Sequence, residues 1–514
     1  MKTYKILLSL LLTFGIITGC EKEKDLLNQT NPNSSVPESF WKNEKDAISA
    51  LNAAYSNIQT PGITRWELFQ YDMRSDEGYS QSPWTDLGNV GKFIFNDYNI
   101  AFIQDIWREC YRGIFRANQI LKYVPDIAMD PVLKKRILAE ATFIRGHLYF
   151  KLVTLWGRVP LVTEIKAPND RPKQGTIEQG WAQVIADFSA AKADLPLQYT
   201  GNDVGRATKG AAMAYLGKAY LQQHKYTEAA AQFKEIIDLV PARYDLIPNF
   251  KDNFTEDFEN NQESIFEIQY ISQNKSGTPS YDIAGGSGSE SSERAQFFGV
   301  RNVGWCDGQV TKKLYNEFMK EKDKDNKVDP RLGYTMFYDH PGELMYGKPY
   351  GHADRPFGPN DRFWKKYTNY WKDTDSYFSG INDRRIRLAD VYLMYAECLN
   401  ELGQTPQAIP FANKVRARSN MKDLELDMNQ SAFREQLRHD RIVELAGESV
   451  RFLDMMRYGI LGPELAGTDP GNTPANESDY DTEFKYFVKN KSEYLPIPLY
   501  ELDANKELKQ NLGW

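Results

Sequence analysis

The sequence predicts a mostly α-helical protein in which a scaffold of helical hairpins carries a large, irregular and partly β insertion. Apolar residues recur at helical spacing over residues 40–60, 102–156 and 208–241, and again after residue 385. Between residues 244 and 384 this periodicity weakens, and turn residues, short apolar runs and aromatic residues replace it. We therefore expect the helices to form the scaffold and residues 244–384 to form a large irregular insertion.

The chain begins with the three-part pattern of a secretory signal peptide. Lys2 and Lys5 precede a short apolar run, and Cys20 directly follows small residues. The run is shorter than the ~20 apolar residues that a transmembrane helix needs, so we expect export rather than a membrane span. The cysteine resembles that of a bacterial lipobox. This resemblance implies a lipoprotein signal peptide over residues 1–19, acylation of Cys20 as a membrane anchor, and a lipidated polar tether over residues 20–37.

A helical region is predicted for residues 38–243. Helical spacing is established within residues 40–60, and it returns at residue 102 after a loop of polar and aromatic residues. The clearest helix carries an unbroken apolar seam and ends at GRVP, where glycine and proline stop helices. The seam consists of Ile137, Ala141, Ile144, Leu148, Leu152 and Leu155.

Residues 208–241 match the tetratricopeptide pattern, in which two antiparallel helices form a hairpin of ~34 residues. Met213 replaces the early tryptophan of that pattern. A single hairpin cannot bury its own faces, so neighbouring helices and a degenerate second unit at residues 392–418 are expected to cover it. The residues at the expected offsets are Leu216, Gly217, Tyr220, Ala229, Phe233 and Pro241.

The last two regions differ in character. Residues 244–384 form the irregular insertion, where SIFEIQY is strand-like and AGGSGSESSE is rich in glycine and serine. Residues 385–514 return to helical spacing and then close with an irregular segment. One helix of this region carries charges of alternating sign, which predict a buried or half-buried ladder of ion pairs rather than a catalytic cluster. These residues are Arg438, Arg441, Glu444, Glu448 and Arg451.

Charge and motifs exclude several functions. The net charge of −7 is mild and both signs are interspersed, which argues against a nucleic-acid partner. No nucleotide-binding, nucleophile or zinc-protease motif is present, so we predict no catalytic residues and no cofactor. The acidic run from Asp323 to Asp329 lacks the glycine and the glutamate of an EF-hand, and we expect a solvated loop without a metal.

The cysteines after the signal peptide do not form a recognisable framework. Cys110, Cys306 and Cys398 have no CxxC spacing, so neither a disulfide scaffold nor a zinc site is expected. Their helical contexts suit Cys110 and Cys398 as small core residues. Whether one pair forms a bridge stays open.

Two loop stretches combine aromatic residues with short polar groups. Aromatic rings stack on the CH faces of sugars, and polar side chains bind the hydroxyls, so a sugar-binding surface needs both. No helical period explains Tyr79 or Trp84 as core residues. The first stretch offers Arg74, Asp76, Tyr79, Trp84 and Asn89 as ligand-binding residues. The second offers Tyr281, Phe298, Arg301 and Trp305 beside the glycine-rich tract.

Several segments together resemble signatures of the SusD/RagB family of surface lipoproteins. They occur in family order, so the resemblance covers the chain from residue 40 to its end. It implies a tetratricopeptide-type helical scaffold in which the irregular insertion forms the ligand-binding half. It also implies an outer-membrane protein, lipid-anchored and facing the cell exterior, that binds oligosaccharide and delivers it to a SusC-like TonB-dependent transporter without catalysis. The segments are FWKNEKDAISALNAAY and residues 139–162, 384–403, 438–459 and 494–514.

Other functions remain open at this point. A RagB-like member would bind peptides for import, and a polar cavity would then replace the aromatic surface. A secreted glycoside hydrolase is a weaker alternative, since 70 acidic residues always offer some carboxylate pair and no motif selects one. The helical hairpins also suit a protein-interaction role, which is compatible with docking to a transporter. The sequence does not identify the glycan.

Overall fold

The computed structural model describes most of the chain beyond the predicted tether. The described residues are 40–80, 82–95, 97–167, 169–272, 290–351, 358, 360–372, 378–461 and 486–514. The signal peptide, Cys20 and Tyr281 lie outside them. Within the described residues, no helix is both long and apolar enough to cross a membrane.

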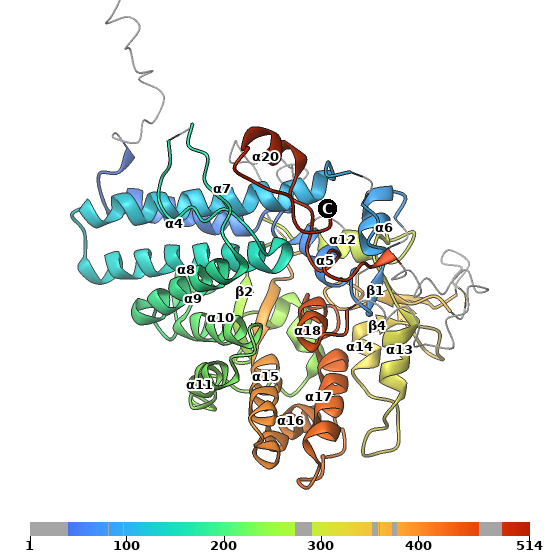
Figure 1. Cartoon of the computed structure of the whole chain (residues 1–514). Helices are drawn as coiled ribbons and strands as arrows, with labels where there is room; N and C mark the ends of the chain where they lie inside the picture. The colour runs from blue at the N-terminus through green and yellow to red at the C-terminus, as the bar shows by residue number, and fades with distance from the viewer. Residues whose placement is uncertain are drawn as a thin grey trace, which may run out of the picture.

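Helices that follow one another in the sequence form a continuous stack. Each packs on the next, from α4 and α7 at the top of Figure 1, through α8 to α11, to α15, α16 and α17 at the bottom. The stack therefore passes directly from the N-terminal helices to the C-terminal ones. Its members are α4 (Glu44–Ile58), α7 (Ala101–Tyr123), α8 (Pro131–Trp156), α9 (Ile177–Asp194), α10 (Lys209–Leu221), α11 (Tyr226–Ile237), α15 (Leu388–Glu401), α16 (Thr405–Arg418) and α17 (Gln430–Leu445).

Local sequence signals define the ends of these helices. Asp130 caps α8 by accepting a hydrogen bond from the Leu133 backbone N–H (2.8 Å), and Pro131 occupies the first turn. The helix stops at Gly157, which has a φ of +68° and a conformation open mainly to glycine. In α9, Thr176 and Gln179 form a reciprocal capping box.

Shorter elements make up the irregular half. In the part of the chain that the structure describes, the strands form antiparallel pairs. These are β1 (Gly78–Tyr79) with β3 (Gln309–Val310), β2 (Ser264–Ile268) with β8 (Asp383–Arg387), β4 (Met336–Phe337) with β7 (Phe363–Trp364), and β5 (Leu344–Met345) with β6 (Lys348–Pro349). The helices are α5 (Arg65–Tyr71), α6 (Thr85–Gly91), α12 (Arg294–Phe298), α13 (Lys312–Met319), α14 (Leu332–Thr335), α18 (Arg451–Tyr458) and α20 (Leu499–Ala504). Short 3-10 turns are η1 (Val124–Asp126), η2 (Gly201–Asp203), η3 (Phe250–Phe254) and η4 (Glu256–Phe258).

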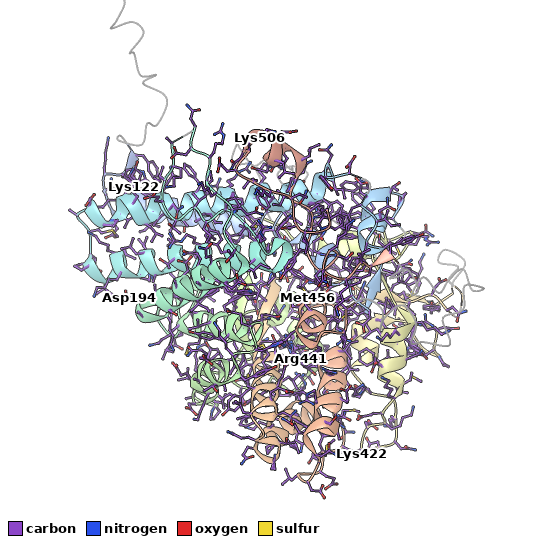
Figure 2. The ribbon with its side chains drawn as sticks, viewed as in Figure 1. Lys122, Asp194, Lys422, Arg441, Met456 and Lys506 are labelled. Atoms are coloured by element: carbon purple, nitrogen blue, oxygen red, sulfur yellow. The ribbon has the colours of Figure 1, made fainter. Side chains whose placement is uncertain are left out.

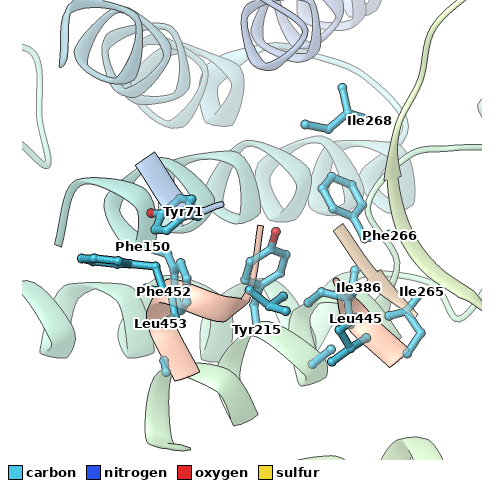
Figure 3. Packing of buried hydrophobic residues seen from close by; sticks show 14 of the residues in the cluster. Tyr71, Phe150, Tyr215, Ile265, Phe266, Ile268, Ile386, Leu445, Phe452 and Leu453 are labelled. Atoms are coloured by element: carbon cyan, nitrogen blue, oxygen red, sulfur yellow. The ribbon is translucent and has the colours of Figure 1, made fainter. Parts of the chain in front are cut away.

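One large hydrophobic core joins the two halves. Tyr71 of α5 lies against Phe452 of α18, with ring centroids 6.5 Å apart. Phe266 of β2 packs beside Tyr215 of α10 (6.2 Å), and Figure 3 shows these residues within one cluster. Sequence-distant segments therefore share a single interior.

Buried ion pairs cross the same interior. In α17, Arg441 is buried and binds Asp454 (2.7 Å) and Asp390 (3.0 Å); Figure 2 labels it near the centre of the view. Glu444 and Glu448 both bind Arg387 of β8. These pairs confirm buried ion pairs for Arg441, Glu444 and Glu448. The expectation of one continuous helix is wrong, because α17 ends at Leu445, Glu448 lies in the turn that follows, and Arg451 begins α18.

Two further details differ from the sequence expectations. Arg438 pairs at the surface with Glu435 (2.8 Å), outside the buried ladder. The acidic run is not simply a solvated loop: Asp323 and Asp329 are buried, and Asp329 holds Arg331 at 2.6 Å. The carboxylates turn inward because buried or backbone donors satisfy them.

The cysteines and possible metal ligands are also placed by the fold. Cys110, Cys306 and Cys398 are buried and unbridged, and burial raises the pKa of the Cys306 thiol to about 11. Among the residues the structure describes, no group of three His, Cys, Asp or Glu side chains is arranged to hold a metal ion.

Candidate functional site

The two loop stretches singled out in the sequence lie side by side in the structure. Strand β1 pairs with β3, so that Gly78 faces Val310 and Tyr79 faces Gln309. The Ser80 hydroxyl donates to the Asp307 carbonyl (2.5 Å), which extends the contact. In Figure 1, β1 and α6 accordingly lie beside the yellow insertion helices.

A chain of aromatic rings joins the two stretches. Trp84 meets Trp66 of α5 edge to face, with centroids 5.5 Å apart. Trp66 meets Phe297 of α12 at 5.5 Å, and Phe297 meets Trp305 at 4.8 Å. Trp66 and Phe297 are buried, whereas Trp305 is 48% exposed and Trp84 is half-buried. The buried rings thus support two tryptophans that reach the surface.

The backbone explains why Trp305 is presented in this way. After α12, the chain turns at Val300 and returns, so that the Trp305 N–H donates to the Gln296 carbonyl (2.8 Å). Gly304 makes this return possible, because a Cβ at that position would lie 2.6 Å from the same carbonyl oxygen. On the other stretch, the Trp84 N–H donates to the Ser82 hydroxyl (3.1 Å) immediately before α6 begins.

Polar residues of the same two stretches also reach the surface. Tyr79 and Asn89 are half-buried, and Arg301 is exposed. Asp307 was not identified from the sequence, although it stands only two residues after Trp305. Burial raises the pKa of its carboxyl group, while a hydrogen bond with Ser82 lowers it. Asp307 is buried, so its carboxyl group lies beneath the surface, which itself combines ring faces with hydroxyl, amide and guanidinium groups.

Arg74, a predicted ligand-binding residue, lies inside the protein. Its guanidinium is 4.3 Å from the Phe452 ring centroid and donates to the Ser492 carbonyl (2.7 Å). Burial lowers the pKa of this group to about 9. Arg74 is fully buried, so the expectation that it contacts a ligand at the surface is wrong.

Asp76 and Phe298 are also interior residues. Asp76 binds Arg451 (2.6 Å) and Lys313 (2.7 Å). Burial alone would raise the pKa of Asp76, but these two cations hold it well below its usual range. Phe298 is 4% exposed and stacks on Phe69 at 5.5 Å. Both residues support the site from beneath and do not form its surface.

Buried charges also fix the elements under the rings. Arg65 of α5 pairs with Glu293, the residue that precedes α12. Burial raises the pKa of Glu293 to about 7, although Arg65 opposes the shift. The guanidinium of Arg65 also lies 4.2 Å from the Trp66 ring centroid. Arg65 therefore links α5, which carries Trp66, to the second loop stretch, which contains Glu293.

The helical scaffold and the aromatic surface on its irregular half define a class of ligand-binding proteins. Comparisons identify the family. A model described as "SusD family" matches residues 262–514, and one described as "Starch-binding associating with outer membrane" matches residues 25–221. The chain belongs to the SusD family.

Curated relatives extend over nearly the whole chain. SusD-like protein P25 of Formosa agariphila is 27% identical over 529 aligned residues, which cover 96% of each chain. A SusD-like protein of Bacteroides ovatus is 25% identical and aligns with 75% of this chain and 70% of its own.

Solved structures show the same architecture. A SusD superfamily protein from Bacteroides vulgatus superposes with a TM-score of 0.80 at 28% identity, covering 92% of this chain and 100% of its own. A laminarin-binding SusD-like protein gives a TM-score of 0.74 at 26% identity, with the same coverage. A surface glycan-binding protein A from Bacteroides thetaiotaomicron, solved with laminarihexaose, gives 0.72 at 21% identity over 91% of this chain and 100% of its own, which shows the shared fold alone.

Proposed function

We propose that this protein binds oligo- or polysaccharide at the cell surface without cleaving it and passes it to a SusC-like TonB-dependent transporter. The surface that binds the glycan contains Trp84 and Trp305, together with Tyr79, Asn89 and Arg301 of the same two stretches. Cys20 carries the lipid anchor that holds the protein to the outer membrane, on its outer face. The stack of helices provides the surface that docks onto the transporter.

One observation carries this proposal. Two stretches more than 200 residues apart, each rich in aromatic and polar residues, meet so that one ring chain ends in an exposed and a half-buried tryptophan. Single exposed apolar side chains are common on protein surfaces, so the meeting of the two stretches, and not exposure alone, supports a binding role. Stacked rings suit a weakly apolar sugar face, and the neighbouring polar groups suit its hydroxyls.

The relatives support a glycan rather than a peptide. One of the similar structures is named as a laminarin-binding SusD-like protein, and one family description names starch. We therefore place laminarin, a β-glucan, first among the glycans to be tested. Two or three aromatic stacks of about 1 kcal/mol each, with some hydrogen bonds, give dissociation constants of roughly micromolar to millimolar size. Affinity in this range also allows release to a transporter.

The test is calorimetry of the chain from Glu21 onward against laminarin, starch and other neutral polysaccharides. We expect one glycan to bind and to remain uncleaved. Trp84→Ala and Trp305→Ala should each weaken binding about fivefold, corresponding to about 1 kcal/mol per lost stack. The double variant should weaken it roughly 25-fold.

Trp371→Ala provides a matched control. Trp371 is 46% exposed, close to the 48% of Trp305, but its ring packs against Tyr370, which is not part of the ring chain. Its removal should leave affinity unchanged. Binding of peptides without any glycan, or equal losses in all three single variants, would contradict the proposal.

A further inference from the structure

A polar groove lies on the helical side of the molecule, between the last turn of α4, the loop before α10 and strand β2. It consists of two adjoining cavities of about 220 and 250 Å3. At roughly 30 Å3 per water molecule, each holds about seven or eight waters, which is the scale of one sugar ring. The residues common to both cavities are Val204, Gly205, Arg206, Phe266 and Glu267.

Amide side chains dominate the polar lining of this groove. An amide presents a donor and an acceptor side by side, so it matches two neighbouring hydroxyls of one sugar. Phe266, Tyr55 and Tyr199 add apolar surface between the amides. The lining amides are Asn52, Gln59, Asn202 and Gln269 in one cavity and Gln198 and Asn260 in the other.

The charges along the groove balance. Arg206 and Arg243 line it together with Glu267 and Glu290. Arg206 is already bound to Asp203 (2.7 Å), and Glu267 to Arg384 (3.3 Å). A groove without net charge, whose charged groups have partners within the protein, favours a neutral ligand over an ion.

The walls of the groove are held in place before any ligand arrives. Gly205 has a φ of +94°, and a Cβ there would lie 2.4 Å from the Gln269 side chain. Only glycine therefore lets the loop before α10 lie against β2. The amides of Gln269 and Asn260 bond reciprocally, at 2.8 and 3.1 Å. The Gln269 amide also accepts from Asn382 (3.0 Å) and donates to the Glu267 carbonyl (3.1 Å), so its hydrogen-bonding capacity is filled and it holds the wall, while the other lining amides are the ones that a sugar can bond.

From this geometry we propose a second saccharide site, in which the groove binds a neutral sugar unit independently of the surface around Trp84 and Trp305. None of the four rings of that chain lines either cavity. A protein with two separated contacts can hold a branched or folded glycan at two points, which raises its avidity without a new strong contact. The groove does not require the first site to be occupied.

Methyl NMR of the chain from Glu21 onward tests the proposal with D-glucose and laminaribiose as probes and D-glucuronate as the charged analogue. Val204, Ile58 and Ile265 line the cavities and serve as reporters. Val132, 78% exposed on α8 and absent from both linings, serves as the control methyl. We expect saturable shifts of the three reporters with the neutral sugars and none at Val132.

Two variants separate the groove from the first site. Trp84→Ala/Trp305→Ala should keep the reporter shifts, whereas Gln198→Ala should weaken them about threefold or more, the size expected for one lost hydrogen bond. Gln198 is exposed, so its removal leaves the fold intact. Absence of shifts, their loss in the double tryptophan variant, or shifts with glucuronate alone would overturn the groove proposal. Polysaccharide binding by the same proteins decides the proposed function separately.

Discussion

Two buried carboxyl groups, Asp72 and Glu77, fasten the turn between α17 and α18 beneath the aromatic surface. Glu77 accepts a hydrogen bond from the Gly447 N–H (3.1 Å), and Asp72 accepts one from the Ser449 N–H (3.0 Å). Burial raises the pKa of Asp72 to about 6, although Arg294 opposes the shift. Burial, followed by the negative charge of Asp72, raises the pKa of Glu77 well above its usual value.

These shifts give a pH dependence of stability with a definite sign. The folded protein keeps both protons at a pH where the unfolded chain has released them. The stability that Asp72 contributes therefore falls as pH rises from the usual carboxyl range through about 6. The contribution of Glu77 falls over a range that extends to higher pH. Lowering the pH through the same window restores it.

Glu77→Gln tests this argument. The amide oxygen still accepts from Gly447, but the ionisable neighbour of Asp72 is gone. Between pH 6 and pH 8, we expect the melting temperature of the wild type to fall by roughly 2 °C more than that of the variant. Differential scanning fluorimetry in matched buffers measures this. Glu435→Gln, at a side chain 67% exposed, should keep the wild-type slope, and equal slopes for all three proteins would refute the argument.

At the same scale, the sequence identified some site residues and misplaced others. Tyr79 and Trp84 stand in a loop without helical period, and the structure keeps them half-buried, with Trp305 more exposed. Asp76 could not be placed from the sequence, because its burial depends on Arg451, 375 positions away. A polar residue looks the same in a sequence whether it meets solvent or a distant buried partner.

At the scale of elements, the hairpin of α10 and α11 depends on close approach at Gly217. A Cβ there would lie 2.4 Å from the Phe233 ring, which belongs to the facing helix. Gly217→Ala must therefore push the helices apart or displace the ring. We expect a loss of about 1–3 kcal/mol, seen as a lower midpoint in urea unfolding.

Gly333→Ala is the matched control for that experiment. Gly333 lies in the helix α14, and an added Cβ would meet nothing within 4 Å. This variant should be neutral or slightly more stable, because alanine restricts the unfolded chain. If both variants unfold at the same urea midpoint, the close approach of the helices at Gly217 does not contribute to stability.

Some helices and strands can be predicted from the sequence pattern, and others cannot. The seam from Ile137 to Leu155 lies within α8, since long amphipathic periodicity survives tertiary packing. The strand-like SIFEIQY contains β2, but its partner β8 reads DRRIR, a run that no hydrophobic pattern marks as a buried strand. Its arginines are buried because carboxylates such as Glu267 and Glu448 neutralise them. Two-residue strands such as β1 and β3 likewise take their register from distant packing alone.

At the scale of the whole molecule, the C-terminal segment closes back onto the N-terminal helices. The Trp156 indole N–H at the end of α8 donates to the Pro496 carbonyl (3.0 Å). The Asn511 amide donates to the carbonyls of Trp156 and Leu495, both at 2.8 Å. With the ion pair between Asp76 and Arg451, these contacts join the segments matched by the two family models into one body.

Because each half buries part of the other, neither should unfold alone. We expect calorimetry of the chain from Glu21 onward to show one transition, with equal calorimetric and van't Hoff enthalpies. Asn511→Ala removes two buried hydrogen bonds, so it should lower the free energy of unfolding by about 1–3 kcal/mol. The whole transition should then shift to lower temperature without splitting in two. Lys506→Ala, at a side chain 76% exposed in the same segment, should leave the transition in place. Two separate transitions in the wild type would mean that the helical stack and the irregular half fold independently, against the shared core and the buried ion pairs that join them.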